Sequence, residues 1–273
     1  FSNDELFDFF KNNKRILLFF VNKSLLSIDS KVFQKINDEK FWKQNYIKYF
    51  LFECQQFISE PLFLEIKNEL GDNILNDFEQ IRIIGENHHY ICNLIRNDSI
   101  KDFIIFINKT NMSLNSLIPQ SIFETNSFLL KNTPTLIEYA AFYGSIQIFQ
   151  YLRLNEVELN EKLWYYSIHG KNPEIIHLLE ESQVPFESYE ILYGKSIKFF
   201  SNEIALYFQN NYLDQEFNKF SILYSIKYHN YKYMLDNDEA TEESKTYNFF
   251  CLCKYNYVYF VDKILHLNIK NIN

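Results

Sequence analysis

The chain has 273 residues and a formal net charge of −8; 47% of its residues are hydrophobic and 23% are charged. This composition provides for a buried core and disfavours a general affinity for nucleic acid or for an anionic membrane. With five glycines and five prolines, it also excludes collagen-like chains and disfavours all-β folds, which need many tight turns.

The first 85 residues have helical periodicity but no clear repeat. Ser2 and Glu5 form a capping-box pattern, Pro61 is placed to start a helix, and Gly71 is placed to end it. Asn12 and the apolar residues after it either form a degenerate repeat or match one by chance. Helices are expected over Asp4–Phe10, Lys14–Val21, Lys31–Ile36, Phe41–Ile58, Leu62–Leu70 and Ile74–Ile84.

Residues 86–273 repeat one apolar frame. With Gly144 as position zero, apolar or small residues fall at −7, −4, −3, +4, +5 and +8, as expected for two short helices joined by a tight turn. The frame recurs about six times, with zeros at Ser99, Gly144, Lys171, Phe200, His229 and Asn256. Residues 108–132 are interpreted as an insertion, a loop with a short helix that packs back on the array. The chain therefore divides into a helical region, 1–85, and a repeat array, 86–273.

Each turn of this frame makes a local prediction. Position zero needs a left-handed backbone, which Gly, Asn and His tolerate better than most residues. Phe200 does not suit this conformation, so its turn is expected to shift onto Ser201 and Asn202. Position +1 should cap the second helix, and in four copies it is Ser145, Asn172, Ser201 or Asn230.

The segment TLIEYAAFYG, residues 135–144, resembles the T-P-L-H-x-A-A-x-x-G signature of ankyrin repeats, and NPEIIHLL, residues 172–179, resembles their second helix. The resemblance covers about residues 86–268 and is specific over 132–180. The Asn- and Phe-rich style is similar to large ankyrin families of parabasalid protists. The resemblance implies an all-α helical-repeat solenoid. The repeats are 27–29 residues long and lack Asp-Gly hairpin signals, which implies short loops in place of projecting fingers.

The sequence shows no motif for catalysis or for a cofactor. It has no phosphate-binding glycine pattern, no H-E-x-x-H and no G-x-S-x-G. His88 and His89 are interpreted as an exposed turn, and His177 as part of a solvated pair with a neighbouring glutamate. The four cysteines are interpreted as buried reduced thiols, with Cys253 in the core. We therefore expect no catalytic residue, cofactor or metal, and no enzyme.

Positions −2 and −1 provide the candidate binding site. The resemblance to ankyrin repeats implies that these positions point toward partners. Three successive repeats here place a lysine and then an aromatic residue at them. The alternative is that the rings pack between neighbouring helices while the lysines are ordinary solvated residues. The candidate partner-binding residues are Phe142, Tyr143, His169, Lys198, Phe199, Lys227, Tyr228, Lys254 and Tyr255.

These features predict a non-enzymatic scaffold that binds an acidic or aromatic-containing protein on the concave face of the array. The alternative is a structural subunit buried in a larger assembly; single-stranded nucleic acid on the stripe is a weaker third hypothesis. No apolar run is long enough to span a membrane and no signal peptide is present, so a cytoplasmic location is expected. The array is also expected to continue beyond Asn273.

Overall fold

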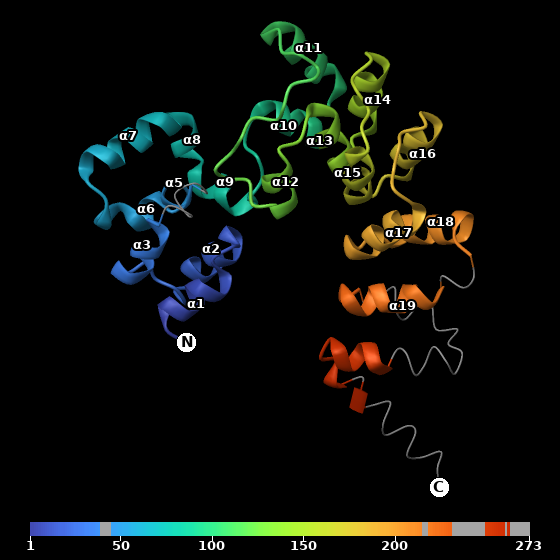
Figure 1. Cartoon of the computed structure of the whole chain (residues 1–273). Helices are drawn as coiled ribbons and strands as arrows, with labels where there is room; N and C mark the ends of the chain where they lie inside the picture. The colour runs from blue at the N-terminus through green and yellow to red at the C-terminus, as the bar shows by residue number, and fades with distance from the viewer. Residues whose placement is uncertain (39–44, 215–217, 231–248, 260, 263–273) are drawn as a thin grey trace. The chain divides into compact units, whose positions relative to one another are not determined.

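The computed structural model describes residues 1–38, 45–214, 218–230, 249–259 and 261–262, with side chains described outside 218–222. The predicted all-α class is confirmed, because the described residues form helices and a single isolated bridge, Leu117 with Thr135, and no strand (Figure 1). The expectation that the array continues past Asn273 falls on residues outside these ranges.

The chain divides into two compact units at boundaries that differ from the predicted ones. Unit 1 comprises residues 1–94 and 116–135, and unit 2 comprises residues 95–115 and 136–273. The first boundary lies inside α10 (Tyr90–Arg96) instead of at residue 85. Of the insertion 108–132, expected to pack back on the array, residues 108–115 belong to unit 2, but residues 116–132 belong to unit 1, where Phe123 is fully buried in the core.

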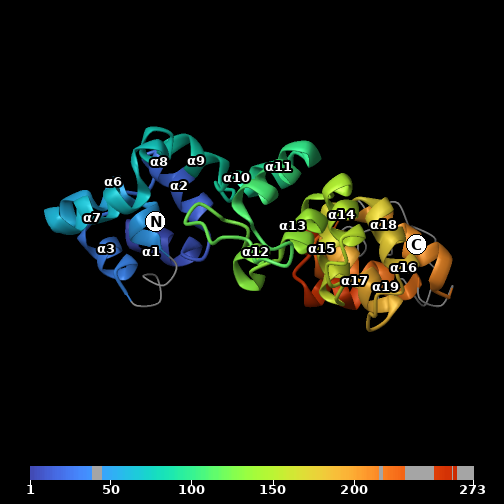
Figure 2. The same ribbon diagram turned by 90° about the horizontal axis from the view of Figure 1, so that it is seen from above.

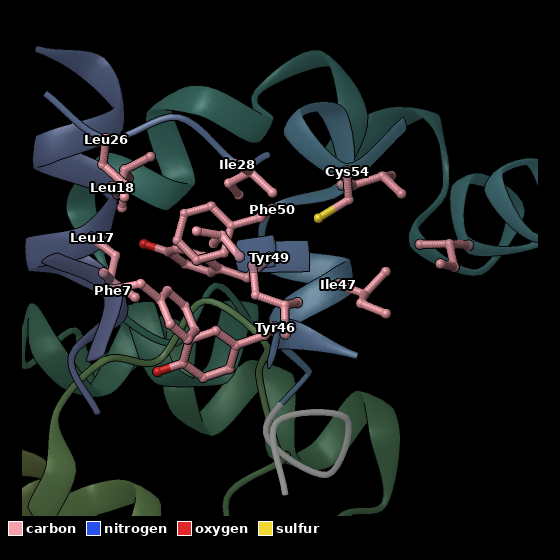
Figure 3. Close-up of a cluster of buried hydrophobic side chains, with 14 of the residues drawn as sticks. Phe7, Leu17, Leu18, Leu26, Ile28, Tyr46, Ile47, Tyr49, Phe50 and Cys54 are labelled. Atoms are coloured by element: carbon pink, nitrogen blue, oxygen red, sulfur yellow. The ribbon is translucent and has the colours of Figure 1, made fainter. Parts of the chain in front are cut away.

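Unit 1 is built around an aromatic core. Tyr46, Tyr49 and Phe50 are each buried to 1% exposure or less, and Figure 3 shows them converging with Phe7 and Leu17 between the helices. Its helices are α1 (Asn3–Phe10), α2 (Lys14–Asn22), α3 (Ser30–Ile36), α5 (Tyr46–Tyr49), α6 (Leu51–Cys54), α7 (Glu60–Leu70), α8 (Asp72–Asn76), α9 (Phe78–Ile84) and α12 (Ser127–Asn132).

The local signals in unit 1 act as the sequence predicts. The Ser2–Glu5 capping box is formed, Pro61 lies in the first turn of α7, and Gly71 ends that helix with φ of +77°. The predicted helix Phe41–Ile58 is wrong: a left-handed Asn45 and a bend at Phe50 divide its described part into α5, α6 and a short 3₁₀ turn. Asn12 has no left-handed backbone and so does not act as a repeat turn.

Unit 2 is a series of helix pairs. The first helices are α13 (Leu136–Tyr143), α15 (Lys162–Gly170), α17 (Tyr189–Lys198) and α19 (Asn218–Lys227). The second helices are α11 (Ile100–Thr110), α14 (Ile146–Leu154), α16 (Pro173–Glu181) and α18 (Asn202–Tyr212); residues 249–254 are also helical. Each first helix packs on the next, α13 on α15, α15 on α17 and α17 on α19, in the order that Figures 1 and 2 show.

The apolar frame correctly predicts the core of these pairs. All six frame positions are buried in each of the copies with zeros at Gly144, Lys171 and Phe200. In the copy at Asn256 the frame is less exact: Leu252 and Cys251 are buried, but Cys253 is exposed, so its assignment to the core is wrong. Cys54 and Cys92 are buried, as expected.

The turns repeat one backbone conformation. Gly144, Lys171, Phe200, His229 and Asn256 all have φ between 54° and 70°. The expected shift of the Phe200 turn is therefore wrong, because Phe200 itself adopts the left-handed backbone conformation. Its side chain is 52% exposed. In the first copy the left-handed residue is Asp98, one position before the predicted Ser99.

Position +1 connects neighbouring repeats, which corrects its predicted role as a helix cap. Asn172 does cap its helix, but Ser145 and Ser201 do not. In four copies the +1 side chain instead donates to the carbonyl at −3 of the preceding repeat: Ser145 to Ile95 at 2.6 Å, Ser201 to Ile168 at 2.5 Å, Asn230 to Ile197 at 3.0 Å and Tyr257 to Ile226 at 2.7 Å. Asp98 supplies the missing cap of α14, accepting from the backbone N–H groups of residues 147 and 148.

Candidate functional site

The nine predicted residues occupy the −2 and −1 positions of successive repeats. We call this set of positions the first-helix stripe. Seven of the nine side chains belong to the last turn of a helix or its C-cap, directly before a left-handed turn residue. The lysines Lys198, Lys227 and Lys254 are exposed, and the rings at −1 are half-buried. The stripe therefore combines packed rings with accessible cations.

One contact recurs along the stripe: a −2 side chain lies against the −1 ring of the next repeat. His169 stacks on Phe199 with ring centroids 3.7 Å apart, and Lys198 Nζ lies 5.8 Å from the centroid of the Tyr228 ring. Where Gly170 leaves the −1 position without a ring, Phe142 instead meets His169, 5.0 Å away. The rings thus pack between neighbouring helices, as the alternative interpretation of the sequence expected.

The structure adds one member to the stripe. The Arg96 guanidinium lies 5.9 Å from the Tyr143 ring and donates to the Tyr139 hydroxyl at 3.0 Å. Because the first left-handed residue is Asp98, Arg96 stands at −2 of its repeat and makes the same contact as Lys198. The sequence signal was present, but a register shifted by one residue concealed it.

The C-terminal half of the stripe retains accessible positive charge. Lys227 Nζ is 5.2 Å from the Tyr228 ring, and Lys254 Nζ is 5.6 Å from the Tyr255 ring. These two lysines and Lys198 form no ion pair with a described residue. Lys198 and Lys227 lie at the C-terminal ends of helices, where the helix dipole favours a cation, so part of their placement stabilises the fold.

His169 in the N-terminal half is held in its neutral form. Burial lowers its pKa to about 4, with smaller contributions from Lys171 and Lys198. An unfolded histidine titrates near pH 6.5, so between pH 6.5 and about 4 the unfolded chain binds more protons at this residue. This difference means that the contribution of neutral His169 to stability is lost as the pH falls through that window.

We therefore expect unit 2 to lose stability on acidification, and His169→Phe to reduce the loss. The phenylalanine retains a ring against Phe199 but cannot bind a proton. The measurement is the free energy of unfolding from urea titrations at pH 7 and pH 5, for the wild type and the variant. An equal decrease in both proteins would show that His169 does not contribute.

The other candidate residues lie elsewhere. His177 is exposed and pairs with Glu180 at 3.2 Å, as expected. His88 and His89 are half-buried and bonded to residues 120 and 121, so the prediction of an exposed turn is wrong. Within the described ranges, no three His, Cys, Asp or Glu side chains are grouped to hold a metal ion. None of the described helices has the length and apolar character needed to cross a bilayer.

Comparisons with protein-family models, with curated proteins and with solved structures find no match to this chain.

Proposed function

We propose that the chain is a non-enzymatic interaction scaffold, an ankyrin-like array whose first-helix stripe binds an acidic segment of a partner protein. The observation that carries the proposal is the series Lys198, Lys227 and Lys254. Each lysine is exposed, each lies over an aromatic ring, and none has a carboxylate partner among the described residues, in a chain of net charge −8.

The ankyrin-like architecture is part of this proposal and rests on three features. The left-handed turns recur every 27 or 29 residues from Gly144 to Asn256, counted as the differences between their positions. First helices pack on first helices, and position +1 bonds to the preceding repeat. We propose that the first helices line the concave face of the array, so that a partner bound there contacts several repeats at once.

The chemistry of the stripe favours an acidic peptide over nucleic acid. A lysine on the face of a ring attracts a carboxylate, while the edge of the same ring offers apolar contact area. The net charge of −8 repels both anions, but a nucleic acid carries a charge on every phosphate and meets more repulsion than a peptide that intersperses a few carboxylates with apolar side chains. Binding to single-stranded oligonucleotides that decreases steeply with salt would favour nucleic acid instead.

Charge reversal at Lys198, Lys227 and Lys254 tests the proposal. The triple change to glutamate should lower the affinity for a labelled peptide of glutamate and tryptophan by more than tenfold, because three attractions become repulsions. Fluorescence anisotropy at low and moderate salt measures the affinity. The matched control reverses Lys101, Lys109 and Lys162, which are exposed cations of unit 2 outside the stripe. An equal loss in both triple variants would mean that only the net charge matters, and would contradict a stripe-specific site.

A structural subunit of a larger assembly is the second candidate. Leu154, Val258 and Tyr259 are each more than 70% exposed, and apolar side chains this accessible are often covered by a neighbour. Analytical ultracentrifugation separates the two functions. A scaffold should sediment as a monomer, whereas an isolated subunit should self-associate at rising concentration.

A further inference from the structure

Residues 117–126, called the strap below, are bonded to a short turn of the same unit, residues 85–89, that the proposed function does not use. Thr125 donates from its hydroxyl to the Gly85 carbonyl at 2.7 Å. Three successive side chains then each bond one strap residue: Asn87 to the Pro119 carbonyl at 2.7 Å, His88 to Ser121 Oγ at 2.8 Å and His89 to the Gln120 carbonyl at 3.1 Å.

One hydrogen bond of the two histidines has a fixed direction: the Gln120 carbonyl can only accept, so His89 Nε2 carries a proton. Ser121 Oγ accepts the Phe123 N–H at 3.1 Å and keeps a second lone pair and its own O–H, so it can bond His88 Nδ1 as a donor or as an acceptor. The charge state of His88 is therefore determined by the surroundings of its ring.

The surroundings oppose a proton on His88. Its ring is 4.4 Å from the His89 ring and meets the fully buried Phe123 ring edge-on at 5.1 Å. Burial, and secondly the neighbouring His89, lower the pKa of His88 to about 4. A proton bound at His88 would place two imidazole rings of like charge in contact whenever His89 is also protonated.

The other charged groups around the strap act in the same direction. Lys14 is buried and its Nζ donates to the Ile122 carbonyl at 3.3 Å; burial lowers the pKa of Lys14 to about 8, against the attraction of Glu124. Burial raises the pKa of Glu124 above its usual range, and Glu86 adds to the shift. Arg15 lies beside Gly85. Backbone hydrogen bonds from residues 126, 125 and 87 oppose the shift of Glu124 without reversing it. Acidification therefore neutralises Glu124 earlier than an ordinary glutamate and leaves the cations charged.

We propose that residues 87–89 form a proton-sensitive binding site for the strap, and that protonation at this turn detaches the strap from the rest of unit 1. The strap lies in the second segment of that unit, residues 116–135. The site thus makes the attachment of this segment within unit 1 depend on pH.

Hydrogen exchange of the full chain, followed by mass spectrometry at pH 7 and pH 5, tests this inference. After correction for the intrinsic exchange rate, protection of peptides within 117–126 should fall roughly tenfold at pH 5, because released His88 binds a proton that the attached state excludes. His88→Asn keeps a hydrogen-bonding partner for Ser121 but cannot be protonated, so the loss of protection between pH 7 and pH 5 should be several-fold smaller than in the wild type, and what remains is the contribution of Glu124. His177→Asn, at an exposed position of α16, is the control and should behave as the wild type.

A strap with unchanged protection in the wild type at pH 5, or a pH dependence as large in His88→Asn as in the wild type, would overturn the proposal. If the strap of His88→Asn is already unprotected at pH 7, a second measurement tests the proposal: the titration of His88 in the wild type, followed by NMR of its ring nitrogens. A midpoint well below 6.5 supports the site; a midpoint near 6.5 contradicts it.

Discussion

Gly170→Ala should destabilise unit 2 by roughly 3 kcal/mol, although alanine is the better helix former. A Cβ at residue 170 would lie 2.1 Å from the Ala141 carbonyl oxygen and 2.9 Å from the Gly144 nitrogen. Both atoms belong to the backbone, so α13 and α15 must move apart. The gain in helix propensity, about 1 kcal/mol, does not offset this displacement.

The measurement is urea unfolding followed by tryptophan fluorescence in a Trp42→Phe background, where buried Trp164 of α15 reports on unit 2 alone. Gly194→Ala is the matched control, because its Cβ would meet the Tyr224 ring at 3.1 Å, and a side chain can yield where a backbone cannot. If Gly170→Ala unfolds at the same urea concentration as the parent, the close approach of the two helices is wrong.

Arg82→Met should destabilise unit 1 by roughly 3–5 kcal/mol. The Arg82 side chain is 2% exposed and bonds both oxygens of Glu53 at 2.8 Å, together with Glu79 and the Tyr49 carbonyl. The guanidinium also lies 5.3 Å from the Phe78 ring. Methionine fills the space but leaves Glu53, which is 19% exposed, without its counter-ion.

Lys48→Met is the control, because Lys48 also pairs with a glutamate of unit 1, Glu69, but at the surface, where such a pair contributes about 1 kcal/mol or less. Adding Glu53→Gln to Arg82→Met should restore part of the lost stability, since it removes the carboxylate that has lost its counter-ion. Denaturation followed by circular dichroism measures all four proteins. A double variant no more stable than Arg82→Met would show that packing, and not the unpaired carboxylate, determines the cost.

Periodicity predicted the parts of the fold that depend on apolar side chains. The frame around Gly144 identifies core residues correctly through three repeats, since a buried position accepts few residue types and therefore leaves a regular pattern. The failures concern polar and backbone features. Phe200 takes a left-handed turn that its residue type does not suggest, and Ser145 bonds a neighbouring repeat instead of its own helix. Neither outcome can be derived from local preference, because each depends on the adjacent repeat.

In the candidate site too, the sequence predicted the positions of the residues but not their contacts between repeats. The positions were predictable from the repeat register, but the pairing of a −2 side chain with the −1 ring of the next repeat was not. His169 shows the reason: a histidine reads as a polar surface residue, yet between Phe142 and Phe199 it becomes part of a ring stack. The strap gave still less signal, since the residues that bind it, 87–89, are separated from it by about thirty positions in the sequence.

The hydrogen bonds from position +1 also determine which pieces of this chain can be exchanged. Ser201 and Asn230 each donate to a carbonyl that lies 33 residues earlier in the chain, in the preceding repeat. The donor and the acceptor of such a bond therefore belong to different repeats. An excision as long as one interval between left-handed residues keeps this pairing: with residues 172–200 removed, Ser201 would face the Ala141 carbonyl and Asn230 the Ile168 carbonyl. An excision of any other length strands a buried carbonyl, which makes that interval the natural module for shortening or lengthening this protein.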